Sequence, residues 1–199
     1  MSKTVLDSLR SETRELHRRT EQALDLPRSS ASITPYASLL RRLLGFYEPL
    51  EASLFGSSHF NDWAGGRLES RRKSPALRAD IAILGPTPMP EVERCSYIPD
   101  LQSGLTLAGA WYVVEGATRG GQVISRHLDR QLGLTRQNGA SFFDCYGEER
   151  ERNWDEFCGL LDTIPMAQAD EVTAGAVAVF SAMHRWLAER PVPARAKAG

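Results

Sequence analysis

The sequence predicts an all-α protein that folds as a single domain. Apolar residues recur every three to four positions along several long segments, which is the period of a buried helix face. No segment alternates apolar and polar residues between turn signals, as a half-buried strand would. A chain of 199 residues with 42% hydrophobic residues suits one globular domain. We therefore expect a folded domain over residues 1–190 and a disordered tail over residues 191–199.

The first half of the chain predicts three helices. The first covers the N-terminal 26 residues, where apolar positions recur at helical spacing. The second runs from Pro35, a favourable residue for a first helical turn, to Phe55. Residues 56–75 are expected to form a loop, and a short helix follows over residues 75–84. Closely spaced prolines then end this helix and keep the chain irregular as far as Pro99.

The second half predicts four more helices. A long helix is expected over residues 101–132, although this segment contains several glycines. A turn signal follows, and then a short helix over residues 140–147. Two further helices are expected over residues 149–161 and 169–190, separated by a proline-containing turn. The whole pattern predicts seven or eight helices.

Composition and charge exclude several classes of protein. The 24 basic and 25 acidic residues leave a net charge of −1, which excludes a nucleic-acid binder that works through bulk charge. The three cysteines are far apart and form no CxxC pair, so we expect no disulfide framework and a reducing compartment. No apolar run reaches the ~20 residues of a spanning helix, and no signal peptide is visible. We expect a soluble, cytoplasmic protein that binds neither membranes nor nucleic acid.

His17 lies at the edge of the apolar stripe of the first helix. At about 100° per residue it is about 20° from Leu24 and about 40° from Thr13 around the helix axis. Glu21 lies one turn later on the same face, where a carboxylate can orient an imidazole, as it does for metal-bound histidines. Arg10 lies two turns earlier, roughly 10 Å along the axis, where it can bind a carboxylate of a flat ligand centred on His17. On this helix alone, surface charges on an amphipathic helix are the simpler interpretation.

The segment over residues 109–122 combines a helical pattern with four glycines. Each interior glycine costs about 1 kcal/mol relative to alanine, so a reason for them is needed. Gly116 and Gly120 fall on one face, and Gly109 lies close to that face two turns earlier. Such a bare strip permits either close helix packing or the close approach of backbone to a flat ligand. Together with His17, it favours a planar ligand held between the two helices.

At these residues the sequence resembles the heme oxygenase family. Leu16-His17-x-x-x-Glu21 and Tyr112-Val-Val-Glu-Gly-Ala-Thr-Arg-Gly-Gly-Gln-Val123 are similar to the proximal and distal helix motifs of heme oxygenases. The resemblance is closest to the soluble bacterial branch associated with bacteriophytochromes, and it runs in order from residue 5 to residue 188. The other matching segments are Gly45–Glu51, Phe142–Gly147, Trp154 with Phe157, and Phe180–Leu187.

The resemblance implies an all-α fold with heme between the two helices and the iron bound by the neutral imidazole of His17, with Glu21 beside it. Arg10 matches a basic residue that meets a heme propionate. Tyr47 matches a tyrosine in the distal hydrogen-bond and water network. The glycines that match those bringing backbone against the heme are Gly116, Gly120 and Gly121.

The resemblance also implies the reaction. The protein is expected to be an oxidoreductase that cleaves heme with O2 and electrons to biliverdin, CO and Fe(II), so that heme is both substrate and cofactor. The chain carries no flavin or iron–sulfur motif, and an external electron donor, a reductase or a ferredoxin, is therefore expected. The bacterial branch implies that the biliverdin serves a bacteriophytochrome as chromophore.

Ala117 departs from the family pattern, because many members carry there an aspartate that organises distal water. The departure leaves open a non-catalytic heme carrier on the same scaffold. A di-iron oxidase is a second alternative, but such sites usually need Glu-x-x-His pairs. A helical interaction module without a cofactor is the third, and it would leave the glycine strip to packing alone. The chain has no Glu-x-x-His pair of the kind that the di-iron alternative needs. The residues three positions before the four histidines are Arg14, Gly56, Ile124 and Ser181.

Overall fold

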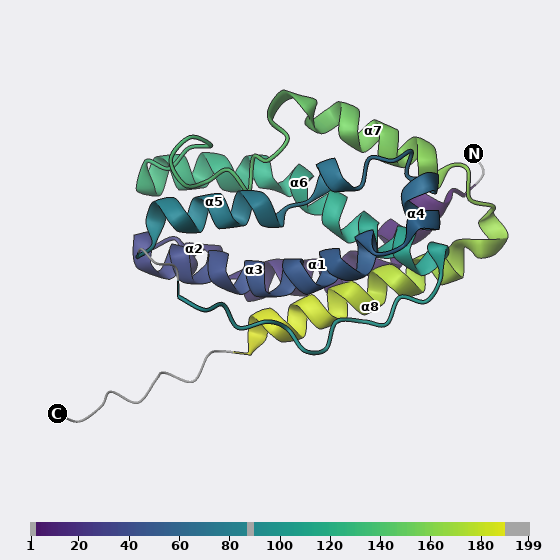
Figure 1. Cartoon of the computed structure of the whole chain (residues 1–199), viewed down its shortest axis with the longest axis horizontal. Coiled ribbons are helices and arrows are strands. Elements are labelled where there is room, and N and C mark those ends of the chain that lie inside the picture. The colour runs from purple at the N-terminus through teal and green to yellow at the C-terminus, as the bar shows by residue number, and fades with distance from the viewer. Residues whose placement is uncertain (1–2, 87–89, 190–199) are drawn as a thin grey trace.

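The computed structural model describes residues 3–86 and 90–189, and every regular element within these residues is a helix (Figure 1). The all-α prediction is confirmed, whereas the tail expected over residues 191–199 lies outside the described residues. Three single 3₁₀ turns cover Glu69–Arg71, Gly147–Glu149 and Met166–Gln168. The α-helices are α1 (Val5–Leu24), α2 (Leu26–Ser29), α3 (Ile33–Phe55), α4 (Ser58–Trp63), α5 (Ser74–Leu84), α6 (Gly104–Leu132), α7 (Arg150–Leu161) and α8 (Ala169–Ala188).

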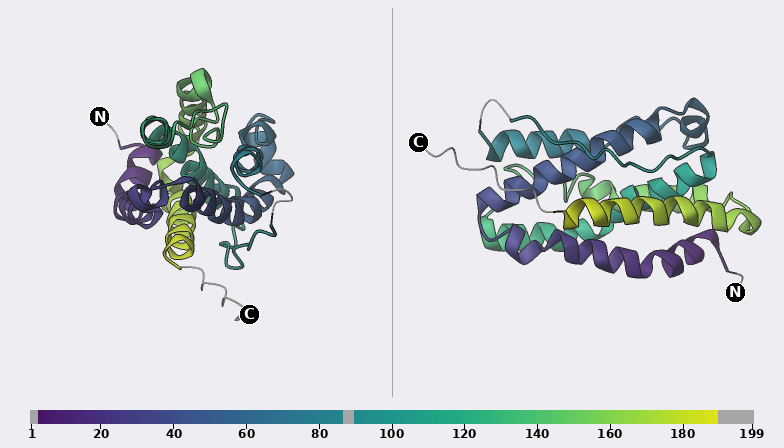
Figure 2. Two further views of the ribbon diagram at one scale, coloured as in Figure 1. Left: turned by 90° about the vertical axis from the view of Figure 1, so that its left-hand side faces the viewer. Right: turned by 90° about the horizontal axis from the view of Figure 1, so that it is seen from below.

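The helix α8 packs along both α1 and α6, and α5 packs along α3. The right-hand view of Figure 2 shows α1 and α8 side by side. The irregular segment before α6 is attached to α3 where the backbone N–H of Cys95 donates to the carbonyl of Gly45 at 2.9 Å. Within the described residues, no helix has both the length and the apolar character that crossing a membrane requires.

The ends of α1 and α6 are fixed by local contacts. Thr4 and Asp7 form a capping box at the start of α1, and Ser103 and Thr106 form one at the start of α6. Each box satisfies backbone N–H groups that the first helical turn leaves unpaired. Gly133 ends α6 with φ of 65°, a left-handed conformation that glycine adopts without strain. The two helices that carry most of the site residues therefore begin and end through local interactions.

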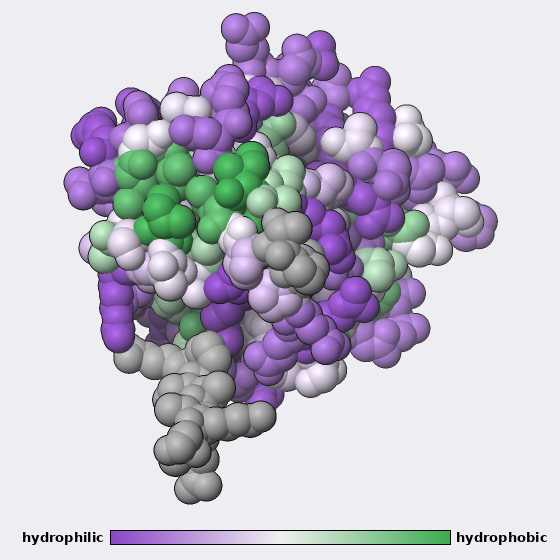
Figure 3. All heavy atoms as spheres, turned by 60° about the vertical axis from the view of Figure 1, so that its left-hand side comes forward, coloured by the Kyte–Doolittle hydropathy of each residue, from purple (hydrophilic) through white to green (hydrophobic). Residues whose placement is uncertain are grey.

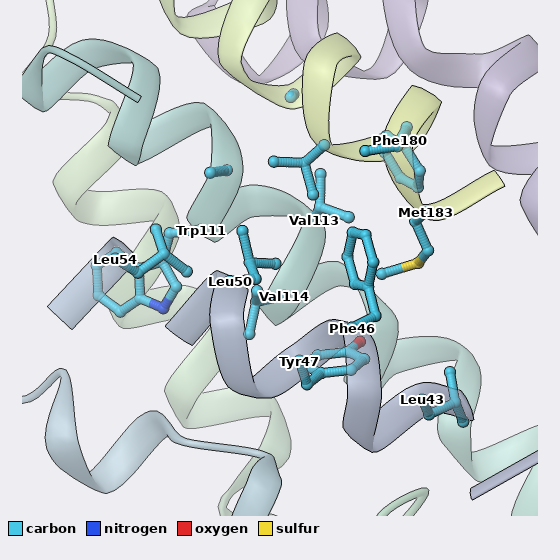
Figure 4. Close-up of a cluster of buried hydrophobic side chains, with 14 of the residues drawn as sticks. Leu43, Phe46, Tyr47, Leu50, Leu54, Trp111, Val113, Val114, Phe180 and Met183 are labelled. Carbon is cyan, nitrogen blue, oxygen red and sulfur yellow. The ribbon is translucent and has the colours of Figure 1, made fainter. Parts of the chain in front are cut away.

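The core lies where α3, α6 and α8 meet, and Figure 4 shows part of it. Trp111 of α6 is 1% exposed and meets Phe157 of α7 edge-on, with ring centroids 5.0 Å apart. Tyr36, Phe46 and Tyr47 of α3 are equally deep. Aromatic pairs in such geometry contribute about 1 kcal/mol beyond the burial of their area. The packing fixes the side of α6 that faces away from α1.

Two buried carboxylates hold irregular backbone in place. Glu51 of α3 accepts hydrogen bonds from the backbone N–H groups of Lys73 and Ser74 at the start of α5. Asp80 of α5 accepts from the backbone N–H groups of Ser141 at 2.9 Å and Phe142 at 2.8 Å. Burial raises the pKa of Asp80, and these hydrogen bonds act in the opposite direction.

Asp80 explains the one expected helix that the structure lacks. The helix expected over residues 140–147 is wrong, because residues 141–146 form successive turns. Asp80 binds two backbone N–H groups of this segment, and that bonding fixes the turn conformation. Residues 56–75 were expected to be a loop, yet they contain α4, whose Phe60 is buried and stacks on Trp63. The first helix also ends earlier than expected, at Leu24, and the next residue, Asp25, caps it with φ of 44°.

The face drawn in Figure 3 is mostly hydrophilic, and its largest hydrophobic area lies at the end of the molecule that is on the left in Figure 1. At this end α3 begins and α5 ends. Ile33 at the start of α3 is 37% exposed, and Ile83 near the end of α5 is 54% exposed.

Candidate functional site

A cavity of about 260 Å³ lies between α1 and α6 and is lined mainly by apolar side chains. The helices α3, α7 and α8 and the turn over residues 141–146 supply its remaining walls. Its lining residues are Arg10, His17, Thr20, Glu21, Leu24, Leu43, Tyr47, Tyr112, Val113, Gly116, Ala117, Arg119, Gly120, Ile124, Phe142, Phe143, Trp154, Phe180 and Met183. The structure therefore brings together seven of the eight residues that the sequence assigns to the site, and Gly121 is the exception.

His17 stands on the α1 wall. Its side chain is 51% exposed, and its Nδ1 lies 3.6 Å from Oε2 of Glu21. The ring meets Phe180 of α8 edge-on, with centroids 5.6 Å apart. An Nδ1 that faces a carboxylate leaves Nε2 as the nitrogen with a free lone pair. The imidazole is thus oriented on one side and available to a ligand on the other.

Two arginines border the same cavity, Arg10 from α1 and Arg119 from α6. Arg10 is exposed, and Arg119 is 45% exposed and lies over the ring of Trp154 at 5.2 Å. Both guanidinium groups can form paired hydrogen bonds with a carboxylate. Sequence reasoning singled out Arg10 alone. The signal for Arg119 was its position three residues after Gly116, about 60° away on the same helix face.

The α6 wall is bare where the cavity lies. A Cβ atom added to Gly116 or Gly120 would meet no atom of the described residues within 4 Å. Gly121 points elsewhere, and its added Cβ would lie 2.1 Å from the carbonyl oxygen of Phe143. Gly109 packs still more closely, with an added Cβ 1.8 Å from the carbonyl oxygen of Val172 in α8. Two glycines of α6 therefore leave space for a ligand, and two permit close packing.

Tyr47 of α3 is 2% exposed and also lines the cavity. Burial raises the pKa of its phenol, and the charge of Glu51 acts in the same direction. The hydroxyl group therefore stays protonated and can donate a hydrogen bond at any physiological pH. Its ring lies edge-on to Phe142 at 5.4 Å, which fixes its orientation.

The aromatic and thioether walls were not assigned to the site from the sequence. Phe180 and Met183 come from α8, and both are drawn in Figure 4 near Val113 of α6. Phe142 and Phe143 come from the turn that Asp80 holds. All of these residues lie within segments that carry the family resemblance, and their positions within these segments were the available signal.

A metal tetrapyrrole with carboxylate side chains fits these walls. The bare glycine face and the aromatic walls admit a flat apolar ring, His17 can bind its metal, and the two arginines can bind its carboxylates. The fold and the cavity together define a helical protein built to bind such a ligand.

The chain belongs to the heme oxygenase family. The model of that family, described as heme oxygenase, matches residues 3–189. A heme oxygenase of Xanthomonas campestris pv. campestris (strain 8004) is 34% identical over 170 residues, which cover 79% of this chain and 92% of the relative. The protein is accordingly a heme-degrading oxygenase.

Two solved structures share the fold. The NO- and CO-bound heme oxygenase from Neisseria meningitidis superposes with a TM-score of 0.79 at 19% identity, covering 94% of this chain and 91% of that one. The heme oxygenase from Leptospira interrogans superposes with a TM-score of 0.73 at 19% identity, covering 94% and 99%. At these identities the likeness concerns the fold alone.

Proposed function

We propose that the cavity between α1 and α6 holds heme, with His17 as the iron ligand, and that the protein opens this heme to biliverdin, CO and Fe(II). One observation carries the proposal: a half-exposed histidine, two arginines and a glycine face without side chains line the same cavity. The helices that bear them are far apart in sequence. Packing of surface charges on α1 does not account for their convergence with the bare face of α6.

The residues of the chain would divide the work of holding the substrate. Glu21 orients the imidazole through Nδ1, and Arg10 and Arg119 bind the propionates near the surface. Because Gly116 and Gly120 have no Cβ, the backbone of α6 can approach the heme ring closely. The backbone itself then limits the space above the ring. Tyr47 presents a protonated hydroxyl group, and Ala117 leaves room for water beside it. Bound heme supplies the iron that activates O2 and the ring that is opened.

The proposal also covers the electron donor, the cellular compartment and the acceptor of the product. The three cysteines of the chain are far apart and form no iron–sulfur motif. We infer that O2 is the oxidant, that a separate reductase or ferredoxin supplies the electrons in the cytoplasm, and that a bacteriophytochrome accepts the biliverdin. The meso carbon attacked is set by how the glycine face and the two arginines orient the ring.

The test is a heme titration of the apo-protein, followed by addition of a reductant and air and by identification of the pigments formed. Wild-type protein is expected to yield biliverdin, and His17→Ala is expected to yield none. His59→Ala is the matched control, because His59 is exposed on α4 and does not line the cavity. Stable heme binding without verdoheme or biliverdin in the wild type would instead support a heme carrier.

A further inference from the structure

A series of aromatic rings runs from the large cavity to the surface at α4. Trp154 of α7 lines the cavity, and the centroid of its ring lies 5.7 Å from that of Phe157. The Phe157 ring lies 5.0 Å from that of Trp111 in α6, and the Trp111 ring lies 6.1 Å from that of Trp63, the last residue of α4. Trp63 is partly exposed, whereas Trp111 and Phe157 are each 1% exposed. Neighbouring rings therefore connect the cavity to solvent through the core.

Three of the four tryptophans in the sequence belong to this series. Core packing alone does not require them, because leucine, isoleucine and phenylalanine fill a core without a polar atom. Indole is also one of the side chains from which a strong oxidant most readily removes an electron. In Figure 4 Trp111 lies apart from Phe180 and Met183, so the series leads away from the α8 wall of the cavity. The series therefore has the composition as well as the geometry of an electron path.

Charged side chains of opposite sign contact two of the three indoles. The guanidinium group of Arg119 lies over the ring of Trp154 at 5.2 Å, beside the cavity. Nε1 of Trp111, deeper in the core, donates a hydrogen bond to Oε1 of Glu115 at 3.2 Å. An oxidised indole carries a positive charge, which a nearby cation disfavours and a nearby carboxylate favours. An electron is therefore easier to remove from Trp111 than from Trp154, and electrons are expected to flow from Trp111 toward the cavity.

Glu115 is held in place as the acceptor for Trp111. It is 1% exposed, and its Oε1 lies 3.6 Å from Nζ of Lys73 while its Oε2 lies 3.4 Å from Nη1 of Arg71. The hydroxyl group of Tyr146 also donates to Oε1, at 2.6 Å. The two cations provide the counter-charges that a buried carboxylate needs. The acceptor is thus available to share the indole proton of Trp111 when this indole loses an electron.

We propose that Trp154, Trp111 and Trp63 form an electron path that protects the heme site from peroxides. When a peroxide oxidises the bound heme without opening its ring, electrons from Trp63 reach the heme along this series. The inference rests on the proposed function, because it assigns the series a role toward bound heme. Phe157 fills the space between the first two indoles, and its benzene ring is too difficult to oxidise to be a station of its own.

The path moves single electrons inward and returns the tryptophans to their starting state. A peroxide takes up two electrons and two protons when its O–O bond breaks and two water molecules form. Each passage moves one electron from Trp63 through Trp111 and Trp154 to the oxidised heme, so two passages restore the heme. Trp63 releases its indole proton to solvent in each passage. Thiols in solution then return the electron, solvent returns the proton, and two thiols end as one disulfide.

The test is the reaction of the ferric heme complex with hydrogen peroxide without added thiol, followed by peptide mass spectrometry that locates the oxidised residues. We expect oxidised tryptophan at Trp63 in the wild type, and none there when the apo-protein receives the same peroxide. Trp111→Phe interrupts the series, so oxidation at Trp63 should be lost and oxidation at Trp154 should increase. Equal oxidation of Trp63 in the wild type and in Trp111→Phe would overturn the proposal.

Trp186→Phe is the matched control. Trp186 is also a buried tryptophan, but its ring packs against Tyr97 at 6.3 Å and it does not line the large cavity. This change should leave the oxidation of Trp63 as it is in the wild type. A loss of Trp63 oxidation in Trp186→Phe as well would show that the effect of Trp111→Phe is not specific to the series.

Trp63→Phe provides the same test if Trp111→Phe does not fold, since Trp63 is the least buried member of the series. In this variant the oxidised residues should be Trp111 and Trp154. Added thiol should slow the bleaching of heme by peroxide in the wild type and should give no such protection in Trp63→Phe. Equal protection of both proteins would contradict the role of Trp63 as the outer end of the path.

The outcomes separate this inference from the proposed function. A heme complex that passes oxidation to Trp63 but forms no biliverdin with a reductant and air would refute the proposed reaction alone. A heme complex that forms biliverdin but oxidises Trp63 equally in the wild type and in Trp111→Phe would refute the electron path alone. A wild-type protein that binds no heme would refute both.

Discussion

Two pairs of glycines in α6 occupy one helix and serve different purposes. Gly116 and Gly120 face the large cavity with open space where a side chain would be. Gly109 lies against the backbone of α8, and Gly121 lies against the backbone at Phe143. Gly109 is only about 20° from Gly116 around the helix axis, so the position along the axis, rather than the face, decides its role. A bare strip on a helix can thus be a packing surface at one end and a ligand surface at the other.

The largest effect is expected for Gly109→Ala. The added Cβ would lie 1.8 Å from the carbonyl oxygen of Val172 and 2.8 Å from the backbone nitrogen of Ala176. Backbone cannot rotate away, so α6 and α8 must separate. The free energy of unfolding of the apo-protein should fall by about 3 kcal/mol, measured by urea denaturation. A stability equal to that of the wild type would show that the two helices do not pack as described.

Gly120→Leu should affect heme and spare the fold. Heme affinity should fall roughly 100-fold, since the bulky side chain fills the space beside the ring at a cost of about 2–3 kcal/mol. The apo-protein should melt at the same temperature or higher, because leucine favours a helix over glycine by up to ~1 kcal/mol. Gly120→Ala is the graded control and should alter the rate or the meso carbon attacked. A large loss of apo-protein stability with unchanged heme affinity per folded molecule would place Gly120 with the packing glycines.

Gly121→Ala should give an intermediate loss of stability, about 1–2 kcal/mol. Its Cβ would lie 2.1 Å from the carbonyl oxygen of Phe143, which belongs to a turn rather than to a helix. The turn can shift more easily than α8 can. Phe143 also lines the large cavity, so we expect the absorption spectrum of added heme to change as well. Thermal melting and the heme absorption spectrum of the same variant check both effects. An unaltered spectrum would separate this glycine from the site.

Arg10→Glu should have the smallest effect. Arg10 lines the cavity from the exposed edge of α1, and heme affinity should fall by about fivefold, or roughly 1 kcal/mol, in line with exposed charge pairs. Arg14→Glu is the matched control, since Arg14 is equally exposed on α1 but does not line the cavity. The difference between the two variants should diminish with added salt. A larger effect of Arg14→Glu would remove the propionate role of Arg10.

The long helices and the two walls of the site were predictable from the sequence because they depend on local pattern, whereas α4 was expected to be a loop. The spacing of His17, Glu21 and Arg10 on one helix face follows from helix geometry alone. The roles of Gly109 and Gly121 were not predictable in this way, since they depend on which backbone lies opposite. The turn over residues 141–146 was missed because a carboxylate 61 residues earlier, Asp80, decides its conformation.

Lys73 shows the same limit. Nothing around it in the sequence distinguishes it from the neighbouring Arg71 and Arg72. Its burial beside Glu115 arises only when the residues before α5, the helix α6 and the turn before α7 come together.

The central claim is that heme lies between α1 and the bare face of α6 with its iron on His17. The most direct measurement is the resonance Raman spectrum of the ferrous heme complex in wild-type protein and in His17→Ala, each with and without added imidazole. The account predicts an iron–histidine stretching band in the wild type, its loss in His17→Ala, and the return of an iron–imidazole band when imidazole fills the vacated position. An unchanged band in His17→Ala without imidazole would contradict the account, because another side chain would then bind the iron.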